Sequence, residues 1–456
     1  MMTVVQKKTE LPKRGRPQQP RSQTAFQTVE AFVIDVNGVP RGKWVPADGL
    51  KKIVSSGLRL PYSAFAPDIW GNDVPATGLI RETGDNDCTC RLVPGRLKPA
   101  PWLKNTAQAL LTVEGFAGDP RHVLARVLGR YKKAGLTPVI AAELEFYLID
   151  GERDPFGAPQ PARIPATGRH AGSARTYSLG AADAFRKTLA DIGRFCAAQD
   201  LPVDTTVSEN GPGQFEINLL HAPDALGAAD DAIFLKRLIK GAAARNGHAA
   251  TFMAKPYSDY SGSGMHVHFS IIDRQGRNIF AGKDDKGSPA LKYALGGLCT
   301  TMADSMAVFA PNANAYRRFA SGTAAPTKIA WGYDNRSTAL RVPHGELDAT
   351  RIEHRVSGAD VNPYLVFAVM LAGALEGLEG KIIPPPPVTG SAYTAKAPAL
   401  PATWDAALDI FSASAFIDRA LGRETKKIFL ACKRQEQEIL AAEVTSAEHA
   451  AYLTEI

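Results

Sequence analysis

The sequence contains few cysteines and no long apolar run. Five cysteines in 456 residues are too few for a disulfide framework, and reduced cysteines are usual in the cytoplasm. Cys88 and Cys90 form a C-x-C pair that no second pair follows, so a zinc knuckle is not supported. The longest apolar stretch, residues 363–375, is shorter than the about 20 residues that a membrane helix needs, and no secretory signal is visible near the N-terminus. We therefore expect a cytoplasmic protein without a membrane segment.

Two familiar nucleotide-binding signatures are also absent. The sequence has no G-x-x-x-x-G-K-[ST] loop, and no kinase-type glycine-rich loop with a catalytic H-R-D. These absences leave the familiar nucleotide-binding folds unsupported. A nucleotide bound by this chain would have to be held by metal ions and arginines between strands.

A net charge of +7 is the one unusual feature of an otherwise ordinary composition, with 45% apolar and 22% charged residues. Residues 1–27 hold six cations and one anion, which leaves +2 for the rest of the chain. This segment has no periodicity, and we interpret it as a disordered basic arm. Its KRGRP sequence (13–17) resembles the core of an AT-hook, but one five-residue basic turn is a weak motif, so we do not expect DNA as a partner.

The remaining sequence divides into two regions. Short apolar runs and turns indicate a small β-rich domain over residues 28–115, beginning with a hairpin around Asn37-Gly38. Asp119 and Pro120 then predict the start of a helix and Gly135 its end, within a larger α+β domain over 116–456. The pattern in this domain predicts strands at 137–150, 203–220 (two strands) and 264–272, and helices around Phe185–Phe195, at 288–308, at 363–377 and from about 404 to the end.

Two glutamates lie on one face of the predicted strand 137–150. Glu143 and Glu145 are two residues apart, so their carboxylates project on the same side, while Leu144 and Phe146 face the core. Adjacent carboxylates repel each other and need a cation inside a sheet. Taken alone, the pair fits a solvated strand face equally well.

Further acidic, imidazole and guanidinium groups occur on other predicted strands. They lie beside a Gly-Pro-Gly turn, on the strand 264–272 and in the segment RIEHR. These residues are Glu209, Glu216, His266, His268, Arg351, Glu353 and Arg355. Oxygen-rich sets with few nitrogens and no thiolate suit Mg²⁺ or Mn²⁺ rather than Zn²⁺. Hard divalent ions together with arginines indicate phosphoryl transfer from a nucleotide.

These residues belong to an ordered series of motifs that resembles the glutamine synthetase superfamily, type I. The motifs are ELEF (143–146), SENGPGQFE (208–216), GSGMHVHFS (262–270), NAYRRF (314–319), YDNRSTALRVP (333–343) and RIEHR (351–355). The resemblance implies an α+β fold, in which a small N-terminal β-grasp domain precedes a large catalytic domain with an antiparallel sheet and flanking helices. It also implies a homo-oligomer, usually a dodecamer of two stacked rings, with active sites between neighbouring subunits.

The resemblance further implies two metal sites and a nucleotide. The first metal would be held by Glu145, Glu209 and Glu216, and the second by Glu143, His266 and Glu353. The metals implied are Mg²⁺ or Mn²⁺, two or more per site, and ATP is the co-substrate.

Residues for the substrates follow from the same resemblance. His268, Ser270 and Arg351 match nucleotide-binding residues. Gly262, Arg318 and Arg355 match residues that hold L-glutamate. Arg336 and Arg341 match the pair that handles the transferred phosphate.

The sequence departs from the family where ammonium is bound. The family places a glutamate in a flap shortly after the substrate arginine, whereas Ala324 occupies that position here, and Ser261 replaces the usual asparagine before the substrate-binding glycine. No segment matches the aspartate that the family brings from the neighbouring subunit, although Asp68 and Asp73 lie in the corresponding region. Loss of the flap carboxylate enlarges the pocket and favours an amine bulkier than ammonium.

We therefore expect an ATP-dependent ligase that joins the γ-carboxylate of L-glutamate to an amine through γ-glutamyl phosphate, similar to the γ-glutamylpolyamine and γ-glutamylmonoamine synthetases. Phe65, Trp70 and Trp331 are candidates to line the amine pocket, or to belong to the core. Two alternatives remain open: an ammonia-using glutamine synthetase with a different ammonium site, and a non-catalytic regulatory protein of the same fold. The sequence identifies neither the amine nor the base that deprotonates it.

Overall fold

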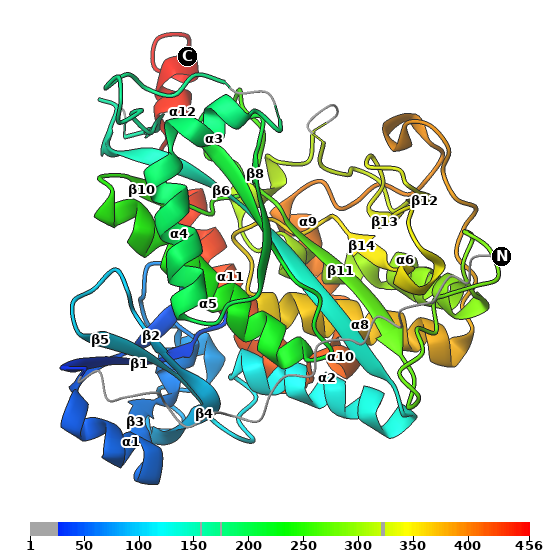
Figure 1. The fold of residues 1–456 in the computed structure, drawn as a ribbon, viewed down its shortest axis with the longest axis horizontal. Coiled ribbons are helices and arrows are strands. Elements are labelled where there is room, and N and C mark those ends of the chain that lie inside the picture. The colour runs from blue at the N-terminus through cyan, green and yellow to red at the C-terminus, as the bar shows by residue number, and fades with distance from the viewer. Residues whose placement is uncertain (1–25, 156, 174–175, 321–323) are drawn as a thin grey trace, which may run out of the picture.

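The computed structural model describes residues 26–155, 157–173, 176–320 and 324–456, which form two sheets and the helices around them (Figure 1). The predicted basic arm lies, apart from its last two residues, outside the described residues. The boundary predicted between residues 115 and 116 stays a prediction. It falls between the last strand of the first sheet and the first long helix.

The first sheet has five strands in the order β2-β1-β5-β4-β3. The predicted hairpin is confirmed, because β1 and β2 pair antiparallel across Asn37-Gly38, where Gly38 adopts a φ of 78°. β1 also pairs with β5 in parallel. The strands are β1 (Thr28–Ile34), β2 (Pro40–Pro46), β3 (Leu58–Pro61), β4 (Asp87–Pro99) and β5 (Thr106–Thr112), and helix α1 (Leu50–Ser56) follows β2.

The second sheet has nine strands, with the path β12-β13-β14-β11-β6-β9-β8 and with β7 and β10 pairing β6. Its pairs are antiparallel as predicted, except that β12 and β13 are parallel. The strands are β6 (Thr137–Arg153), β7 (Pro159–Pro161), β8 (Val203–Ser208), β9 (Gln214–Leu219), β10 (Ala249–Thr251), β11 (Met265–Ile272), β12 (Trp331–Tyr333), β13 (Leu340–Val342) and β14 (Ile352–His354).

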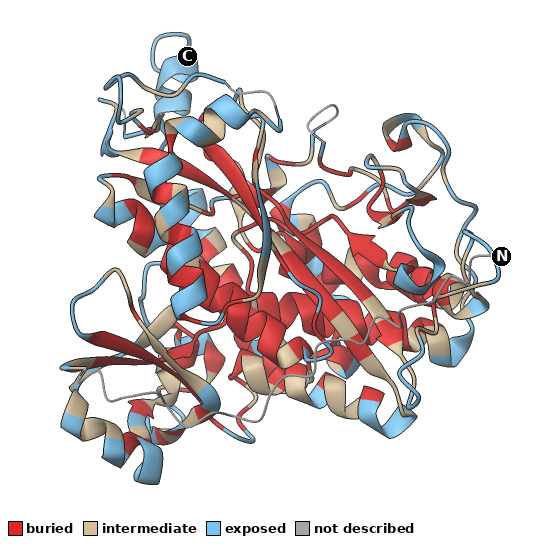
Figure 2. Cartoon of the chain, in the orientation of Figure 1, coloured by how far each residue is buried: buried red, intermediate tan, exposed pale blue. Residues whose placement is uncertain are grey.

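Helices cover one face of this sheet. α2 and α5 contact β6, and α8 packs against both helices and against α6. Figure 2 shows that α5, α6 and α8 are largely buried, whereas α2 is buried on one side only. The side chains of β6 that face them, from Ile140 to Phe146 at every second position, are fully buried, so the opposite face of the strand is left for polar groups. The helices of this part are α2 (Pro120–Ala134), α3 (Leu179–Ala184), α4 (Arg186–Ala198), α5 (Ala225–Arg245), α6 (Pro289–Phe309), α7 (Ala313–Tyr316) and α8 (Pro363–Gly380).

The two ends of α2 are the ones that the sequence predicts. The Asp119 carboxylate accepts a hydrogen bond from the backbone N–H of Arg121 (2.9 Å), and Gly135 ends the helix with a φ of 72°. α8 is, within the described ranges, the one helix long and apolar enough to cross a membrane. In this fold 78% of this helix is buried inside the protein, so α8 is a core helix.

The helical region predicted from about residue 404 to the end is confirmed, and it is divided into several helices. The structure has four helices there, α9 (Trp404–Ala413), α10 (Ala415–Ala420), α11 (Arg423–Ala442) and α12 (Ser446–Tyr452). Ser414 caps α10 through its side chain, and Gly422 adopts a φ of 84° immediately before α11. A side chain that competes for backbone groups and a left-handed glycine each interrupt a helix, although the apolar periodicity continues across them.

Glycines allow α6 and α8 to approach each other closely, so a larger residue at this contact should destabilise the fold. A Cβ at Gly297 on α6 would lie 2.6 Å from the Cα of Gly377 on α8, whereas a Cβ at Gly193 on α4 would meet nothing within 4 Å. Gly297→Ala should therefore lower the free energy of unfolding by about 1–3 kcal/mol through overpacking. Gly193→Ala, the matched control, should raise it by about 0.5–1 kcal/mol. Urea unfolding followed by circular dichroism checks both, and equal effects of the two substitutions would contradict the close contact.

Buried polar contacts join the first sheet to the rest of the fold. Arg96 on β4 contacts Asp230 (2.9 Å) and Asp231 (2.6 Å) on α5. Asp230 is fully buried and also accepts hydrogen bonds from Arg121 (2.9 Å) and from the Tyr364 hydroxyl (2.6 Å). Four elements, β4, α2, α5 and α8, therefore meet at one carboxylate.

The C-terminal helices contact the same first region. The Asn362 amide at the start of α8 donates to the backbone oxygen of Asp35 (2.9 Å). On α11, the Cys432 thiol contacts the backbone oxygen of Ala66 (3.3 Å), and the Lys433 ammonium donates to the Asn37 side chain. Residues from the end of the chain thus complete the surface against which the first sheet packs.

Candidate active site

Strand register assembles the predicted site on the face of the large sheet that the helices leave free. His266 on β11 lies opposite Glu143 on β6, and Glu145 lies opposite Glu216 on β9. On the other side of β11, His268 lies opposite Glu353 on β14. Side chains directly opposite each other have Cβ atoms about 5 Å apart, so adjacent strands bring these groups within reach of one ion.

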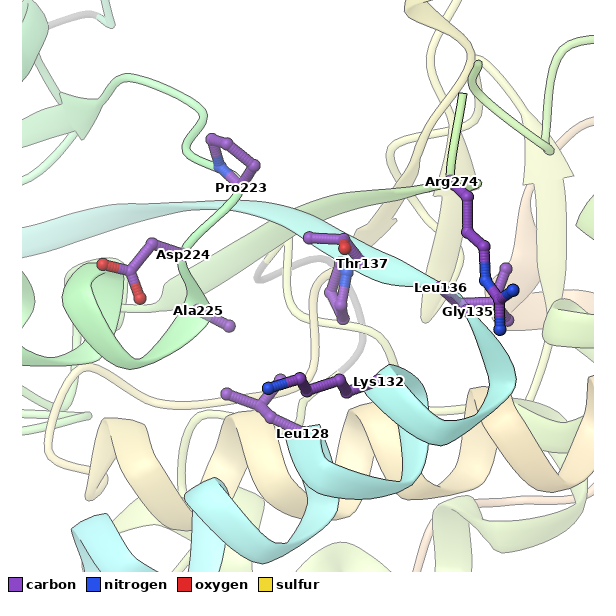
Figure 3. A pocket seen from close by; sticks show the side chains of 10 residues that line it. Leu128, Lys132, Gly135, Leu136, Thr137, Pro223, Asp224, Ala225 and Arg274 are labelled. Carbon is purple, nitrogen blue, oxygen red and sulfur yellow. The ribbon is translucent and has the colours of Figure 1, made fainter. Parts of the chain in front are cut away.

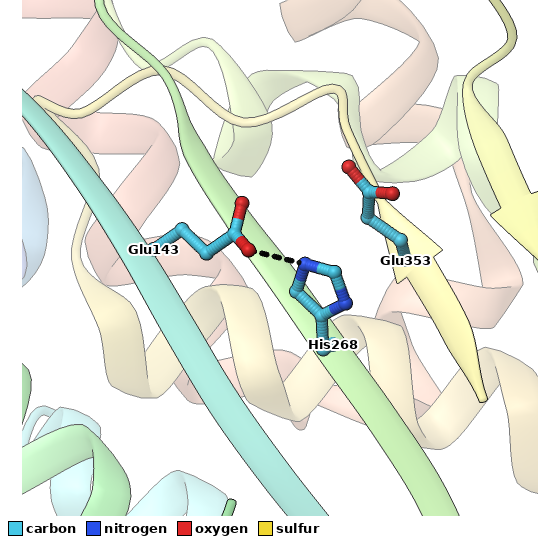
Figure 4. Close-up of side chains that lie close together, drawn as sticks. All are labelled: Glu143, His268 and Glu353. Carbon is cyan, nitrogen blue, oxygen red and sulfur yellow. Dashed lines mark ion pairs between the residues drawn. The ribbon is translucent and has the colours of Figure 1, made fainter. Parts of the chain in front are cut away.

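Glu143 is at the centre of this group. Its Oε1 lies 2.8 Å from His268 Nε2 and its Oε2 lies 3.5 Å from His266 Nδ1. In Figure 4 the side chains of Glu143 and His268 point toward each other, and Glu353 lies across from them on β14. Two sets of potential metal ligands have their ligand atoms within 4.8 Å of one another: Glu143, His268 and Glu353 in one, and Glu143, Glu216 and His266 in the other.

These two sets differ in part from those that the resemblance implies. His268, expected at the nucleotide, is grouped with Glu143 and Glu353, while Glu216 is grouped with Glu143 and His266. Glu145 instead accepts a hydrogen bond from the backbone N–H of Gly264 (2.8 Å). The division of six ligands between two metals stays a prediction. Five of the six are observed on one face of the sheet, and Glu209 comes directly after the end of β8.

The electrostatics of the group fit a cation. Burial and the neighbouring carboxylates Glu143, Glu145 and Glu209 raise the pKa of Glu216 to about 9. Burial and the charge of Glu145 raise the pKa of Glu209 to about 7, against the opposing effect of Arg336. Burial also opposes ionisation of Glu143, but contacts with His266 and His268 outweigh it and hold the pKa of this carboxyl well below its usual range. Crowded carboxylates that retain protons in the absence of a cation are a donor set suited to hard divalent ions.

Glu353 connects the acidic group to the arginines. It is 1% exposed and pairs with Arg341 (2.7 Å) and with Arg355. Burial acts against its charge, but Arg355, His266, His268 and Arg341 lower its pKa to about 2. Arg341 also pairs with Asp334, to which sequence reasoning assigns no role; its signal is the one acidic residue inside the motif YDNRSTALRVP, which contains Arg336 and Arg341.

Arg318 is buried and held by backbone oxygens. Its guanidinium donates to Val356 (2.8 Å) and Arg355 (3.3 Å). A Cβ at Gly262 would lie 2.5 Å from the backbone oxygen of Ala254 and 2.8 Å from Arg318 Cγ, so only glycine fits there. The three residues predicted to hold glutamate are therefore neighbours.

Two of the three predicted nucleotide residues, His268 and Ser270, lie on β11, and the third, Arg351, lies directly before β14. Arg351 Nε donates to Nδ1 of His268 (3.2 Å), and Ser270 is two residues beyond His268 on the same strand. The ring of His221, which sequence reasoning also misses, lies 6.0 Å from the His268 ring; no motif marks it. Arg336 lines a cleft of about 500 Å³ together with residues 387–390.

The candidates for the amine pocket are not brought together. Phe65 and Trp331 are buried core residues, and the Trp331 indole donates to the backbone oxygen of Pro385 (2.6 Å). Trp70 is half-exposed. The carboxylate of Asp68 is buried and accepts hydrogen bonds from Asn72 in its own turn and from Gln435 on α11, so it joins this turn to α11.

A separate cleft of about 430 Å³ opens at the start of β6. Figure 3 shows Lys132 of α2, Asp224 before α5 and Arg274 around it. None of the metal-ligand candidates around Glu143 lines this cleft, so we do not assign the reaction to it.

The chain matches a known protein family and several of its members. Residues 117–452 match the family model described as "Glutamine synthetase, catalytic domain". Gamma-glutamylputrescine synthetase PuuA of Escherichia coli (strain K12) is 41% identical over 416 residues, which cover 90% of this chain and 88% of that protein. Glutamate–isopropylamine ligase of Pseudomonas sp is 33% identical over 388 residues, 81% of each chain.

The chain is also similar to a relative named for another amine and to a solved structure. Gamma-glutamylethanolamide synthetase GlnA4 of Streptomyces coelicolor (strain ATCC BAA-471 / A3(2) / M145) is 33% identical over 93% of this chain and 92% of that protein. The solved structure "Apo GmaS without ligand" is 28% identical, with a TM-score of 0.81 over 95% of this chain and 98% of that chain. The predicted α+β class is confirmed, and the chain belongs to the glutamine synthetase family.

Proposed function

We propose that this protein is an ATP-dependent ligase that joins the γ-carboxylate of L-glutamate to an amine. One observation carries the proposal: the carboxylates and histidines of β6, β9, β11 and β14 share one face of the large sheet, in a chain whose relatives are named for putrescine, isopropylamine and ethanolamide. The position of the family's ammonium-binding carboxylate is occupied by Ala324. A site without that acid has lost a group that binds a small cation.

The residues divide the reaction between them. Gly262, Arg318 and Arg355 bind and orient L-glutamate, and His268, Ser270 and Arg351 bind ATP. The γ-carboxylate attacks the γ-phosphate, while Arg336 and Arg341 hold the charge that moves with the phosphoryl group. Mg²⁺ or Mn²⁺, held by Glu143, Glu145, Glu209, Glu216, His266 and Glu353, would neutralise the phosphates.

An amine then attacks the acyl carbon of γ-glutamyl phosphate and expels phosphate. The attacking nitrogen must be uncharged, and a free alkylamine has a pKa of about 10, so it must lose a proton in the site. No side chain of the described residues is assigned this role.

Assembly and location are part of the same proposal. We propose a homo-oligomer, with the dodecamer of the family as the expected form, in the cytoplasm. The five cysteines, all buried and free, support a reducing compartment. Light scattering of the purified protein tests the oligomer.

An amine panel tests the function. Phosphate release from ATP and L-glutamate should be measured with putrescine, spermine, isopropylamine, methylamine, ethanolamine, aniline and ammonium. The best amine should exceed ammonium in kcat/KM by about tenfold or more, because a pocket built for an apolar chain gains about 1–3 kcal/mol from one or two buried methylenes. Ammonium as the best acceptor would identify an ammonia-using enzyme, and no turnover with any acceptor would favour a regulatory protein.

A further inference from the structure

We propose that Tyr393 is a positioning residue for the second half of the reaction, holding the backbone on the amine side of the site. This inference rests on the proposed function and adds a residue that lies outside the sequence motifs of the site. Tyr393 lies in a short 3-10 turn, Ala392–Thr394, far along the chain from every predicted site residue.

The Tyr393 hydroxyl contacts the segment where the family keeps its ammonium-binding acid. It donates a hydrogen bond to the backbone oxygen of Ala325 (3.1 Å). Ala324 is exposed and has a φ of 63°, a left-handed conformation that a residue other than glycine adopts only at a cost. The Tyr393 hydroxyl, through its hydrogen bond to the carbonyl oxygen of the next residue, Ala325, helps to hold this strained backbone in place.

The same phenol lies close to the arginines predicted for glutamate. Burial raises the pKa of Tyr393, while the charges of Arg355 and Arg318 and a hydrogen bond from the Ala324 backbone act against this rise. The phenol is therefore protonated at neutral pH and acts as a hydrogen-bond donor rather than as a base.

A chain of hydrogen bonds fixes the segment that carries Tyr393. The backbone N–H of Ala392 donates to the Ser337 hydroxyl (2.9 Å), which donates to the Asn335 side chain (2.6 Å). The Asn335 amide in turn donates to the backbone oxygens of Val388 (3.1 Å) and Gly390 (2.8 Å). Residues 388–393 therefore connect the loop that carries Arg336 to the backbone at Ala324–Ala325.

This arrangement separates two steps of the reaction. We assign phosphoryl transfer to Arg336, Arg341 and the metal-ligand candidates, and among the described residues the Tyr393 hydroxyl donates to Ala325 and to none of these side chains. In this proposal the amine approaches past Ala324 and Ala325, where the family keeps its ammonium-binding acid, and the Tyr393 hydroxyl holds this backbone through its hydrogen bond to Ala325. Removal of the hydroxyl should therefore affect the second step alone.

Tyr393→Phe tests this separation because it removes one hydroxyl and keeps the ring. Positional isotope exchange in ATP, with L-glutamate and no amine, reports formation of the acyl phosphate and should stay within about twofold of the wild type. Steady-state kcat/KM for the best amine should fall about five- to tenfold, the size expected for one lost hydrogen bond. KM for L-glutamate should be unchanged.

Tyr452→Phe on the exposed helix α12 is the matched control and should change neither measurement. An equal fall of isotope exchange and amine turnover in Tyr393→Phe would show a general structural role, and unchanged amine turnover would show no role; either result overturns the inference. If the wild type turns over amines, these results leave the proposed function intact. A wild type without turnover on any amine would overturn the proposed function itself, and this inference with it.

Discussion

Glu353→Gln should lower kcat about a thousandfold or more while the protein stays folded. Glu353 lies between two guanidinium groups and beside Glu143 and His268, so one substitution removes a metal-ligand candidate and the anion that holds Arg341 and Arg355. Loss of one preorganised charge in an active site costs about 10²–10³ in rate, and this residue serves both the acidic group and the arginines. ADP release with glutamate and the best amine measures the effect.

Glu145→Ala should have a similar effect, since Glu145 lies opposite Glu216 in the same group. Glu152→Gln is the control for both, because Glu152 lies on the same strand, β6, with an exposed side chain. Size-exclusion chromatography should show the same oligomer for all variants. Turnover within tenfold of the wild type in Glu353→Gln would show that the reaction centre lies elsewhere.

Asp230→Ala should lower the free energy of unfolding by about 3–5 kcal/mol. The substitution leaves Arg121 without its buried carboxylate partner and leaves Arg96 with only one of its two aspartate partners. Removal of one partner of a buried ion pair costs about 3–5 kcal/mol of stability. The Tyr364 hydroxyl, which is also buried, loses its acceptor. The apparent melting temperature, followed by tryptophan fluorescence, should fall accordingly.

Asp183→Ala provides the comparison. Asp183 pairs with Arg186 at 2.6 Å, but the two side chains are 60% and 79% exposed, and surface pairs of this kind contribute about 0–1 kcal/mol. A similar change in melting temperature for both variants would mean that the Asp230 contacts do not join the first sheet to the catalytic part.

Residue spacing along a strand was sufficient to predict which side chains share a face. Glu143 and Glu145 occupy alternate positions of β6, and His266 and His268 do the same on β11. Alternation is a local property of extended backbone, so it is visible in a single segment. The start and end of α2 were predictable for the same reason, because a cap acts on its own helix.

Pairing between strands was not predictable in this way. Whether Glu143 lies opposite His266 or His268 depends on a shift of two residues that leaves every face unchanged, so the apolar pattern does not decide it. The contact of His268 with Glu143, and hence its grouping as a metal-ligand candidate, depends on this register. Tyr393 illustrates the wider limit, because its contact with Ala325 joins loops whose paths no periodic pattern describes.

The contacts of the first sheet with the end of the chain also determine when this protein can finish folding. Residues 28–112 leave the ribosome early, whereas Asn362, Cys432 and Lys433, which contact Asp35, Ala66 and Asn37, leave it much later. Until α11 has been synthesised, the surface around these N-terminal residues lacks its packing partner, so this side of the first sheet stays exposed to solvent. Protein that stops short of α11 would keep this surface open, and it is there that chaperones or proteases would distinguish incomplete chains from complete ones.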